Sequence, residues 1–192
     1  MQKHLLLLMC AMALVLNACD EPVVEDATPP STVRMTLEFP NETKEFLQAD
    51  DASAVFFEGT CYDWNTSEDL TSHILAVDLV WPDDISFYSP TPWTTGTFDM
   101  VSSATYECTD LHAEAWINTD PIAGWITEAA GDYTWIETAG GVLNVTEYTE
   151  GEGFSPGTVS LTWTDTLYIE DGFGTALSIV PVSLTASNCE LY

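Results

Sequence analysis

Apolar residues recur at every second position through most of the chain after residue 32, and turn residues interrupt this alternation at short intervals. A period of two places alternate side chains on opposite faces of an extended strand, so the pattern predicts β-structure. In the clearest case, every odd-numbered residue from Leu111 to Ile117 is apolar. The expected strands are Val33–Phe39, Ala54–Trp64, Ser72–Trp81, Ile85–Ser89, Thr95–Val101, Ala104–Cys108, Leu111–Asn118, Asp132–Thr138, Gly141–Thr149, Gly157–Ile169 and Thr175–Ser187.

Short strands joined by turns predict an all-β fold, either an antiparallel β-sandwich or a flattened barrel of about 9–11 strands. Residues 121–130 break the alternation and are expected to form a short helix, which begins at Pro121 and ends near Gly131. A strand over Trp125–Glu128 is the alternative. Pro181 cannot donate to a ladder, so we expect it at an edge or a bulge. Trp81 and Trp163 are expected in the core.

The chain has a formal net charge of −28, with 31 acidic residues against three Lys and Arg residues. Such a field repels nucleic acid and anionic lipid head groups, so no nucleic-acid partner is expected. The acidity serves either a function or solubility. Hydrophobic residues make up 46% of the chain, which separates it from disordered acidic proteins.

A basic start at Lys3 precedes the apolar run Leu5–Leu16, which is too short to span about 30 Å of hydrocarbon as a helix. The run ends in Leu16-Asn17-Ala18-Cys19, which resembles the lipobox of bacterial lipoproteins. The resemblance implies that residues 1–18 are a signal peptide and that Cys19 is lipidated. An ordinary signal peptide with a chance cysteine is the alternative.

Residues 19–32 are rich in Pro and acidic residues and are expected to form an extended tether to a single domain over 33–192. The partner of the lipid is then a membrane of the bacterial envelope, and we expect the outer membrane, on its periplasmic or surface-exposed side. The Asp20-Glu21 pair is similar to surface-export signals of some bacteria and to inner-membrane retention signals of others.

Short motifs in the second half of the chain carry a further resemblance. They are Gly96-Thr97-Phe98, the segment from Gly140 to Tyr148, and Gly157-Thr158-Val159-Ser160-Leu161. This order resembles small uncharacterised secreted lipoproteins of Bacteroidetes and deltaproteobacteria. The resemblance implies a β-sandwich and no enzymatic activity.

Three cysteines remain after Cys10 and Cys19 are set aside, so in an oxidising compartment one is left unpaired. Strand parity places Cys61 and Cys108 inward and Cys189 on the polar face of the last strand. We therefore predict a Cys61–Cys108 disulfide and a free Cys189. One bulge between Leu184 and Cys189 would reverse the facing of Cys189.

Sequence motifs of known catalytic chemistry are missing from the chain, which has no nucleophile elbow, zinc-binding helix or phosphate loop. We expect no catalytic residues, metal site or cofactor. Acidic pairs such as Asp50-Asp51 and Asp83-Asp84 fit solvated turns, although weak Ca²⁺ binding there is an alternative.

The outward side of the strand at 111–118 is the candidate ligand site. A tryptophan beside carboxylates and amides suits a sugar, because the ring stacks on C–H groups while polar groups orient the hydroxyls. Trp93, in a turn, is a second exposed candidate. The predicted binding residues are Asp110, His112, Glu114, Trp116, Asn118 and Trp93. A polar solvent-facing surface without a ligand is the alternative.

Three functions therefore remain open at this point. The first is a lipid-anchored envelope protein that binds a glycan or another protein. The second is a glycoside hydrolase with paired carboxylates, which a deep cleft would favour. The third is a structural envelope component. Composition favours a binding or structural role over an enzyme.

Overall fold

The computed structural model describes residues 29–63, 65–79, 83–117, 135–152, 155–170 and 176–192. In this part of the chain eleven strands and no helix are found, and the sheet is mostly antiparallel and not closed into a barrel. The predicted all-β fold is confirmed. The strands are β1 (Thr32–Glu38), β2 (Thr43–Ala49), β3 (Ser53–Asp63), β4 (Glu68–Asp78), β5 (Asp84–Ser89), β6 (Gly96–Asp99), β7 (His112–Trp116), β8 (Trp135–Thr138), β9 (Val142–Thr149), β10 (Gly157–Glu170) and β11 (Ala176–Leu191).

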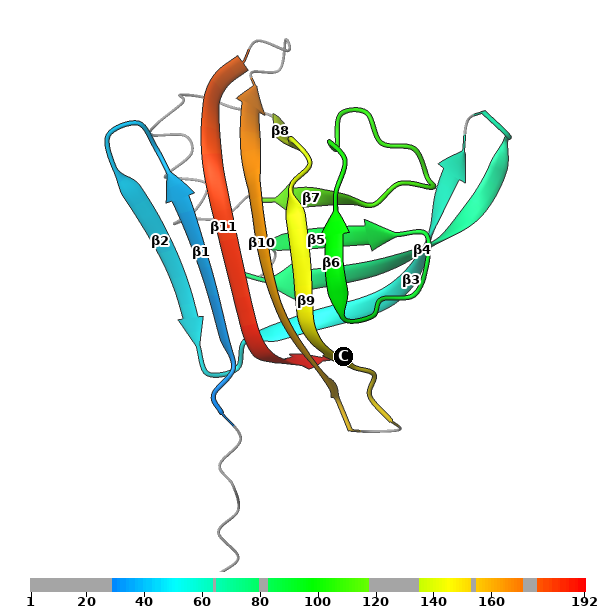
Figure 1. Cartoon of the computed structure of the whole chain (residues 1–192), viewed down its shortest axis with the longest axis horizontal. Coiled ribbons are helices and arrows are strands. Elements are labelled where there is room, and N and C mark those ends of the chain that lie inside the picture. The colour runs from blue at the N-terminus through cyan, green and yellow to red at the C-terminus, as the bar shows by residue number, and fades with distance from the viewer. Residues whose placement is uncertain (1–28, 64, 80–82, 118–134, 153–154, 171–175) are drawn as a thin grey trace, which may run out of the picture.

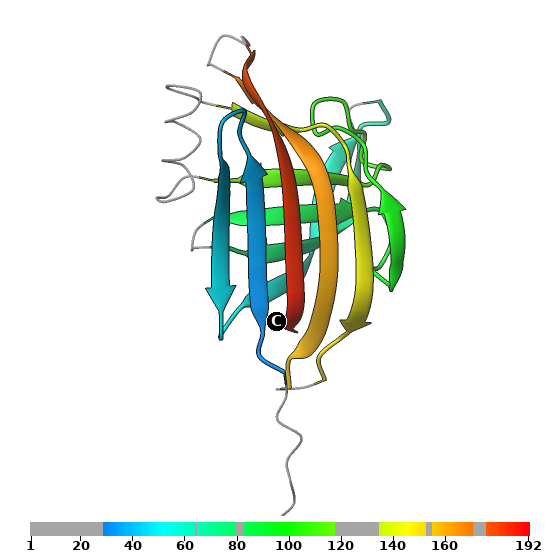
Figure 2. The ribbon, with the colours of Figure 1, turned by 60° about the vertical axis from the view of Figure 1, so that its left-hand side comes forward.

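The strands form two layers (Figures 1 and 2). In the first layer β2, β1, β11, β10, β9 and β6 lie side by side in that order. In the second layer β3, β4, β5 and β7 cross behind them at a steep angle. The layers join where the end of β11 pairs in parallel with the start of β3, through Glu190 with Ser53 and Leu191 with Ala54. One continuous sheet is therefore folded into a sandwich.

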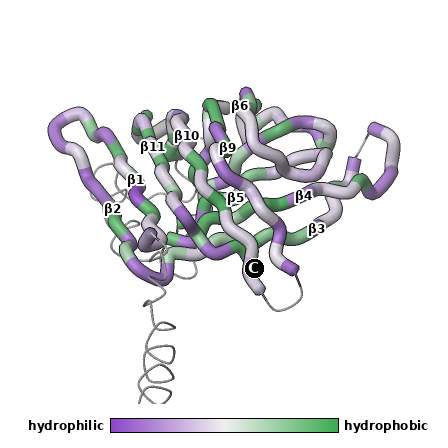
Figure 3. The backbone as a smooth tube through the Cα atoms, turned by 60° about the horizontal axis from the view of Figure 1, so that its bottom comes forward, coloured by the Kyte–Doolittle hydropathy of each residue, from purple (hydrophilic) through white to green (hydrophobic). Residues whose placement is uncertain are grey.

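The core fills the space between these layers, and apolar segments of the chain face one another there (Figure 3). Trp163 of β10 is fully buried, and its ring meets the ring of Phe87 of β5 edge to face, with centroids 5.6 Å apart. This contact links the two layers, and the predicted core position of Trp163 is confirmed. Truncating a buried aromatic residue of this kind costs about 3–5 kcal/mol.

One predicted strand is wrong, and one strand of the structure was not predicted. Ala104–Cys108 forms a loop of turns, held by backbone bonds such as Asp110 N–H to Glu107 O, and its facing toward the core is not found. β2 was not predicted, because its half-buried row of Lys44, Phe46 and Gln48 is too polar to stand out as an inward face. The predicted helix at 121–130 and Trp81 lie outside the described residues.

Bulges flank β10 on both sides at Ser160. Between the pairs Leu161–Ala186 and Val159–Cys189, β11 has one residue more than β10. Asn188 adopts a left-handed backbone there, with φ of 51°, and its freed N–H donates to Ser160 Oγ at 2.9 Å. β9 has its own extra residue opposite the same place. Because bulges bend and twist strands, they direct the end of β11 toward β3.

The bulge at Asn188 reverses the predicted facing of Cys189. Leu184 and Ala186 face the core, and the extra residue brings Cys189 inward as well, so that it is fully buried. Cys189 is unpaired, as predicted. Pro181 is exposed and lies one residue before the ladder between β11 and β1 begins at Val182, so it interrupts no bond to β1.

Burial predicts the reactivity of Cys189. Desolvation raises the pKa of its thiol to about 11, so little thiolate exists at neutral pH. In a variant with Cys10 and Cys19 changed to serine, we expect no reaction with an aromatic disulfide reagent in the folded protein and one reactive thiol after unfolding in denaturant without reductant. Spectrophotometric thiol counting checks this. Fast labelling of the native protein would contradict the buried placement.

Candidate functional site

The outward side chains of β4, β5 and β7 form three short rows, which we call the outer face. The rows, read from β4 through β5 to β7, are Asp78, Asp84 and Trp116; Ala76, Ser86 and Glu114; and Ile74, Tyr88 and His112. Three of the predicted binding residues therefore share this face, and β5 adds residues that the sequence analysis did not include.

Trp116 is the most exposed aromatic residue of the outer face, with 53% of its surface accessible. Its cross-strand neighbour on β5 is Asp84, and Glu114 precedes it by two residues on the same side of β7. An exposed indole ring is thus bordered by two carboxylates. This is the arrangement that the sequence predicted for Trp116 and Glu114.

His112 was predicted on the surface, but only 3% of it is exposed, so the expectation of a solvent-facing histidine is wrong. Its ring lies between two tyrosine rings in nearly parallel stacks, with centroids 3.6 Å from Tyr106 and 4.6 Å from Tyr88. Tyr88 is its neighbour in the sheet, whereas Tyr106 comes from the loop before β7. The loop therefore covers His112.

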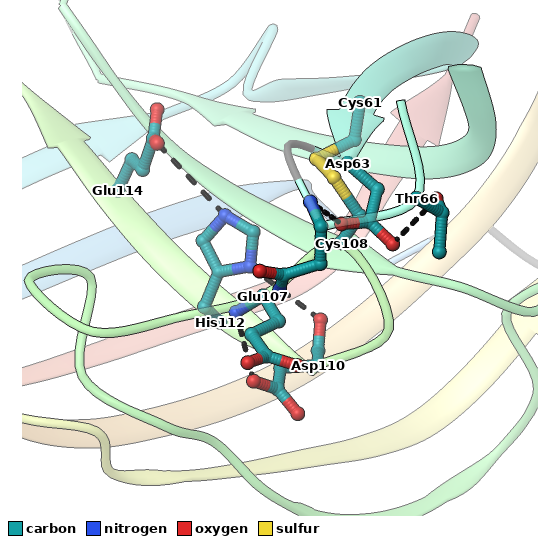
Figure 4. Close-up of a disulfide and its surroundings, with 9 residues drawn as sticks. Cys61, Asp63, Thr66, Glu107, Cys108, Asp110, His112 and Glu114 are labelled. Carbon is teal, nitrogen blue, oxygen red and sulfur yellow. Dashed lines mark hydrogen bonds and ion pairs between the residues drawn. A yellow bond between two sulfur atoms is a disulfide. The ribbon is translucent and has the colours of Figure 1, made fainter. Parts of the chain in front are cut away.

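A disulfide between Cys61 of β3 and Cys108 holds this loop against the second layer, as Figure 4 shows. The predicted pairing is confirmed, with Cα atoms 5.6 Å apart. The reason given for it was wrong, because the core-facing residues of β3 are Ala54 and Phe56, while Phe57 is 46% exposed and shares the outward parity of Cys61. Adjacent phenylalanines leave the facing of this strand undecided in the sequence.

The base of the loop is fixed where residues 138–141 pass against Met100–Ser102. Ser102 Oγ–H donates to Thr138 O, and Met100 N–H donates to Gly141 O. Gly140 has φ of 93°, and a Cβ there would lie 2.6 Å from Met100 O, so only glycine fits. These contacts and the disulfide fix both ends of the segment that carries Tyr106.

Polar side chains of the outer face lie in contact around Glu114. The hydroxyl of Tyr88 donates to Glu114 Oε2 at 3.1 Å. The other oxygen of Glu114 lies 3.8 Å from Nε2 of His112 (Figure 4). Burial and the charge of Glu114 raise the pKa of Tyr88 well above its ordinary value, so its proton stays in place.

Negative charge accumulates around Trp116. Burial raises the pKa of Asp84, and the nearby charges of Asp78, Asp83 and Glu114 raise it further, against a hydrogen bond from Ser86 that lowers it. Arg34 and Lys44 lie on β1 and β2 and pair with Glu45 and Glu42, each at 3.0 Å. Neither of these basic residues is on the strands of the outer face.

The other predicted binding residues have different roles. Trp93 is 3% exposed and donates its indole N–H to His73 O at 3.1 Å, so the prediction that it is exposed is wrong. Its turn folds back over the sheet, and its ring meets Phe98 edge to face. Asp110 accepts a hydrogen bond from Glu107 N–H and thereby shapes the covering loop. Asn118 lies outside the described residues.

A cavity of about 490 Å³ lies at the other end of the molecule, beside the C-terminus. Its lining residues are Phe56, Glu150, Gly151, Ser155, Pro156, Leu191 and Tyr192. Glu150 is the one acidic side chain among them, and no residue of the outer face contributes. This cavity does not supply the paired carboxylates that the hydrolase alternative needs.

Among the described residues, no three His, Cys, Asp or Glu side chains gather as a metal ion would require. Asp50 and Asp51 both have left-handed backbones in the turn between β2 and β3, and Asp83 is buried. Weak Ca²⁺ binding at these acidic pairs stays a prediction.

Tyr88 and Asp84 are the residues that sequence reasoning missed. Ile85 and Phe87 face the core, so the alternation of β5 already places Asp84, Ser86 and Tyr88 on its outward side. The strand was recognised, but its outward row was not. Only the register of β5 with β7 shows that this row lies beside Trp116 and Glu114.

Comparison with protein families, curated proteins and solved structures gives no match to this chain. Over the residues that the structure describes, no helix is both long and apolar enough to cross a bilayer. The function of this protein must therefore be inferred from the chain's own residues.

The buried His112 predicts a specific loss of stability in acid. Burial lowers its pKa to about 4, below the ordinary value of about 6.5, so folding favours the neutral ring. Its stabilising contribution is complete above about pH 6.5 and is lost as the pH falls toward 4. The Tm of the natural protein should therefore fall relative to that of His112→Phe between about pH 7 and pH 4.5.

Phenylalanine retains a stacked ring between Tyr88 and Tyr106 and removes the titration, which makes His112→Phe the matched control. The carboxylates near His112, from Asp110 and Glu114, are present in both proteins, so the difference between the two curves isolates the histidine. Parallel curves in thermal melts would show that His112 is not buried as described.

Proposed function

We propose that this protein is a lipid-anchored component of a bacterial envelope whose β-sandwich binds a glycan on its outer face. The observation that carries the proposal is the exposed ring of Trp116 between the carboxylates of Asp84 and Glu114. An aromatic ring offers an apolar surface to sugar C–H groups, and adjacent carboxylates accept hydrogen bonds from hydroxyls. The disulfide-held loop and the hydrogen bond from Tyr88 to Glu114 support a fixed shape for this surface.

A hydrolase on the same face is the second candidate. In its favour, Asp84 has a raised pKa and lies diagonally across the sheet from Glu114, as an acid and its partner carboxylate would. Glu114, however, accepts from Tyr88, and the two carboxylates lie outside the described cavity. Binding without cleavage therefore ranks first. A purely structural role is the remaining alternative, and it does not account for the exposed Trp116.

Substitution of Trp116 tests the binding proposal. Trp116→Ala should abolish binding on a glycan array, because the stacking surface is lost. Its free energy of unfolding in urea should change by less than about 1 kcal/mol, the usual range for surface substitutions. Leu47→Ala is the control, since Leu47 is 54% exposed on β2 in the other layer and should leave binding unchanged.

Two outcomes would contradict the proposal. If Trp116→Ala lost several kcal/mol of stability, the ring would be part of the fold and not a ligand platform. If the natural protein bound no glycan, or bound equally well with alanine at position 116, the outer face would not be the site. Release of shorter sugars from a bound oligosaccharide would instead favour the hydrolase.

The proposed anchor is Cys19. The lipobox-like sequence supports it, and β1 begins at Thr32, the last residue of the proposed tether of residues 19–32. Lipid chains add about 0.8 kcal/mol per buried CH₂, so two or three of them give stable attachment to a membrane. On this proposal the sandwich is displayed from the outer membrane, at its periplasmic or outer side.

Mass spectrometry of the protein expressed in a bacterial host with outer membranes tests the anchor. The N-terminal peptide should begin at Cys19 and carry acyl chains, and Cys19→Ala should leave the signal peptide attached. An unmodified Cys19, or cleavage at another residue, would contradict lipidation and leave the binding proposal unaffected.

A further inference from the structure

The side chains of the outer face offer more hydrogen-bond acceptors than donors. This imbalance indicates which chemical groups a ligand of this face would supply. The hydroxyl donors of the face already have acceptors within it. Ser53 Oγ–H, from the adjoining strand β3, donates to Asp78 at 2.6 Å, and Ser86 Oγ–H donates to Asp84 at 2.7 Å. The hydroxyl of Tyr88 donates to Glu114. The carboxylates of the face offer more acceptor positions than these hydroxyls fill.

A second observation points the same way. Nδ1 of His112 lies 3.5 Å from Asp110 O, which can only accept, so that nitrogen carries the proton. In the neutral ring Nε2 is then an acceptor, and it is buried with no hydrogen-bond partner. It faces the carboxylate of Glu114 at 3.8 Å, so two acceptors face each other. Although Tyr88 donates to Glu114 Oε2, no donor lies between Glu114 Oε1 and Nε2 of His112.

The negative charges of the outer face indicate that the donor group of the ligand is positively charged. Asp78, Asp84 and Glu114 lie on one face, and the two basic residues of the described chain are on β1 and β2 in the other layer. An exposed indole ring attracts a cation over its π-face, and tryptophan does so more strongly than tyrosine or phenylalanine. A ring of this kind beside carboxylates therefore favours a ligand group that is positively charged and rich in N–H donors.

We infer that the ligand of the outer face is a saccharide bearing free amino groups, with an ammonium held between Trp116, Asp84 and Glu114. This inference rests on the proposed glycan-binding function and narrows it to one class of sugar. The sugar ring stacks on the indole, as in the general proposal. The ammonium supplies the donors and the positive charge that the face lacks.

The test compares two ligands that differ only in the amine. These are an oligosaccharide of β-1,4-linked glucosamine and its fully N-acetylated counterpart of the same length. Calorimetry at about pH 6, below the usual pKa of an amine, measures both affinities. We expect the free amine to bind about tenfold more tightly, a difference of about 1.4 kcal/mol that lies within the range of a cation–π contact. High salt should reduce this preference.

Matched variants separate the site from the general negative charge of the protein. Asp84→Asn and Glu114→Gln should each remove most of the preference for the amine, measured in each variant as the ratio of the affinities for the two oligosaccharides. Asp99→Asn removes one exposed charge from β6 in the other layer and should leave the preference intact. If all three variants lowered amine binding equally, the attraction would be nonspecific and the inference would be wrong.

The remaining outcomes also decide the question. If both oligosaccharides bound equally well and Trp116→Ala abolished both, the amine inference would be overturned. The proposed glycan-binding function would still be supported. Tighter binding of the acetylated sugar would lead to the same two conclusions. Failure of both oligosaccharides to bind in a Trp116-dependent manner would overturn the inference, and a full glycan array with no binding would overturn the proposed function as well.

Discussion

Backbone pairing between the end of β11 and the start of β3 holds the two layers of this protein together as one sheet. Only Glu190 and Leu191 of β11 pair with β3, and the bonds between Tyr192 and residues 54 and 56 extend the contact. The end of β11 reaches this position because of the bulge at Asn188, which Ser160 stabilises by accepting the freed N–H. A regular strand in its place would have directed Cys189 to solvent and carried the terminus away from β3.

Folding the sheet at this corner gives the second layer two different faces. Its inner face packs against the first layer, as in the contact between Phe87 and Trp163. Its outer face is left for other contacts, and the Cys61–Cys108 disulfide brings a loop across one end of it. Tyr106 on that loop covers His112 and leaves Trp116 exposed, so the loop defines where the accessible part of the face begins.

Much of the candidate site could be predicted from alternation alone. The facing of Glu114 and Trp116 follows from the apolar odd-numbered residues of their strand, and the structure agrees. The burial of His112 and Trp93 could not be predicted, because each depends on contact with a distant segment, Tyr106 in one case and the carbonyl of His73 in the other. The local pattern also does not predict which residue of a neighbouring strand lies beside Trp116, because the register between β5 and β7 decides that this residue is Asp84.

The sequence by itself determined the all-β class, most strand positions, the core placement of Trp163 and the strongly negative net charge, because each depends on local period or on residue counts. Tertiary structure alone decided the inward facing of Cys189, the cover over His112 and the meeting of Asp84 with Trp116. One extra residue in a strand reverses every side chain beyond it, and strand register is set by long-range pairing, so these features exist only once the sheet has closed on its core.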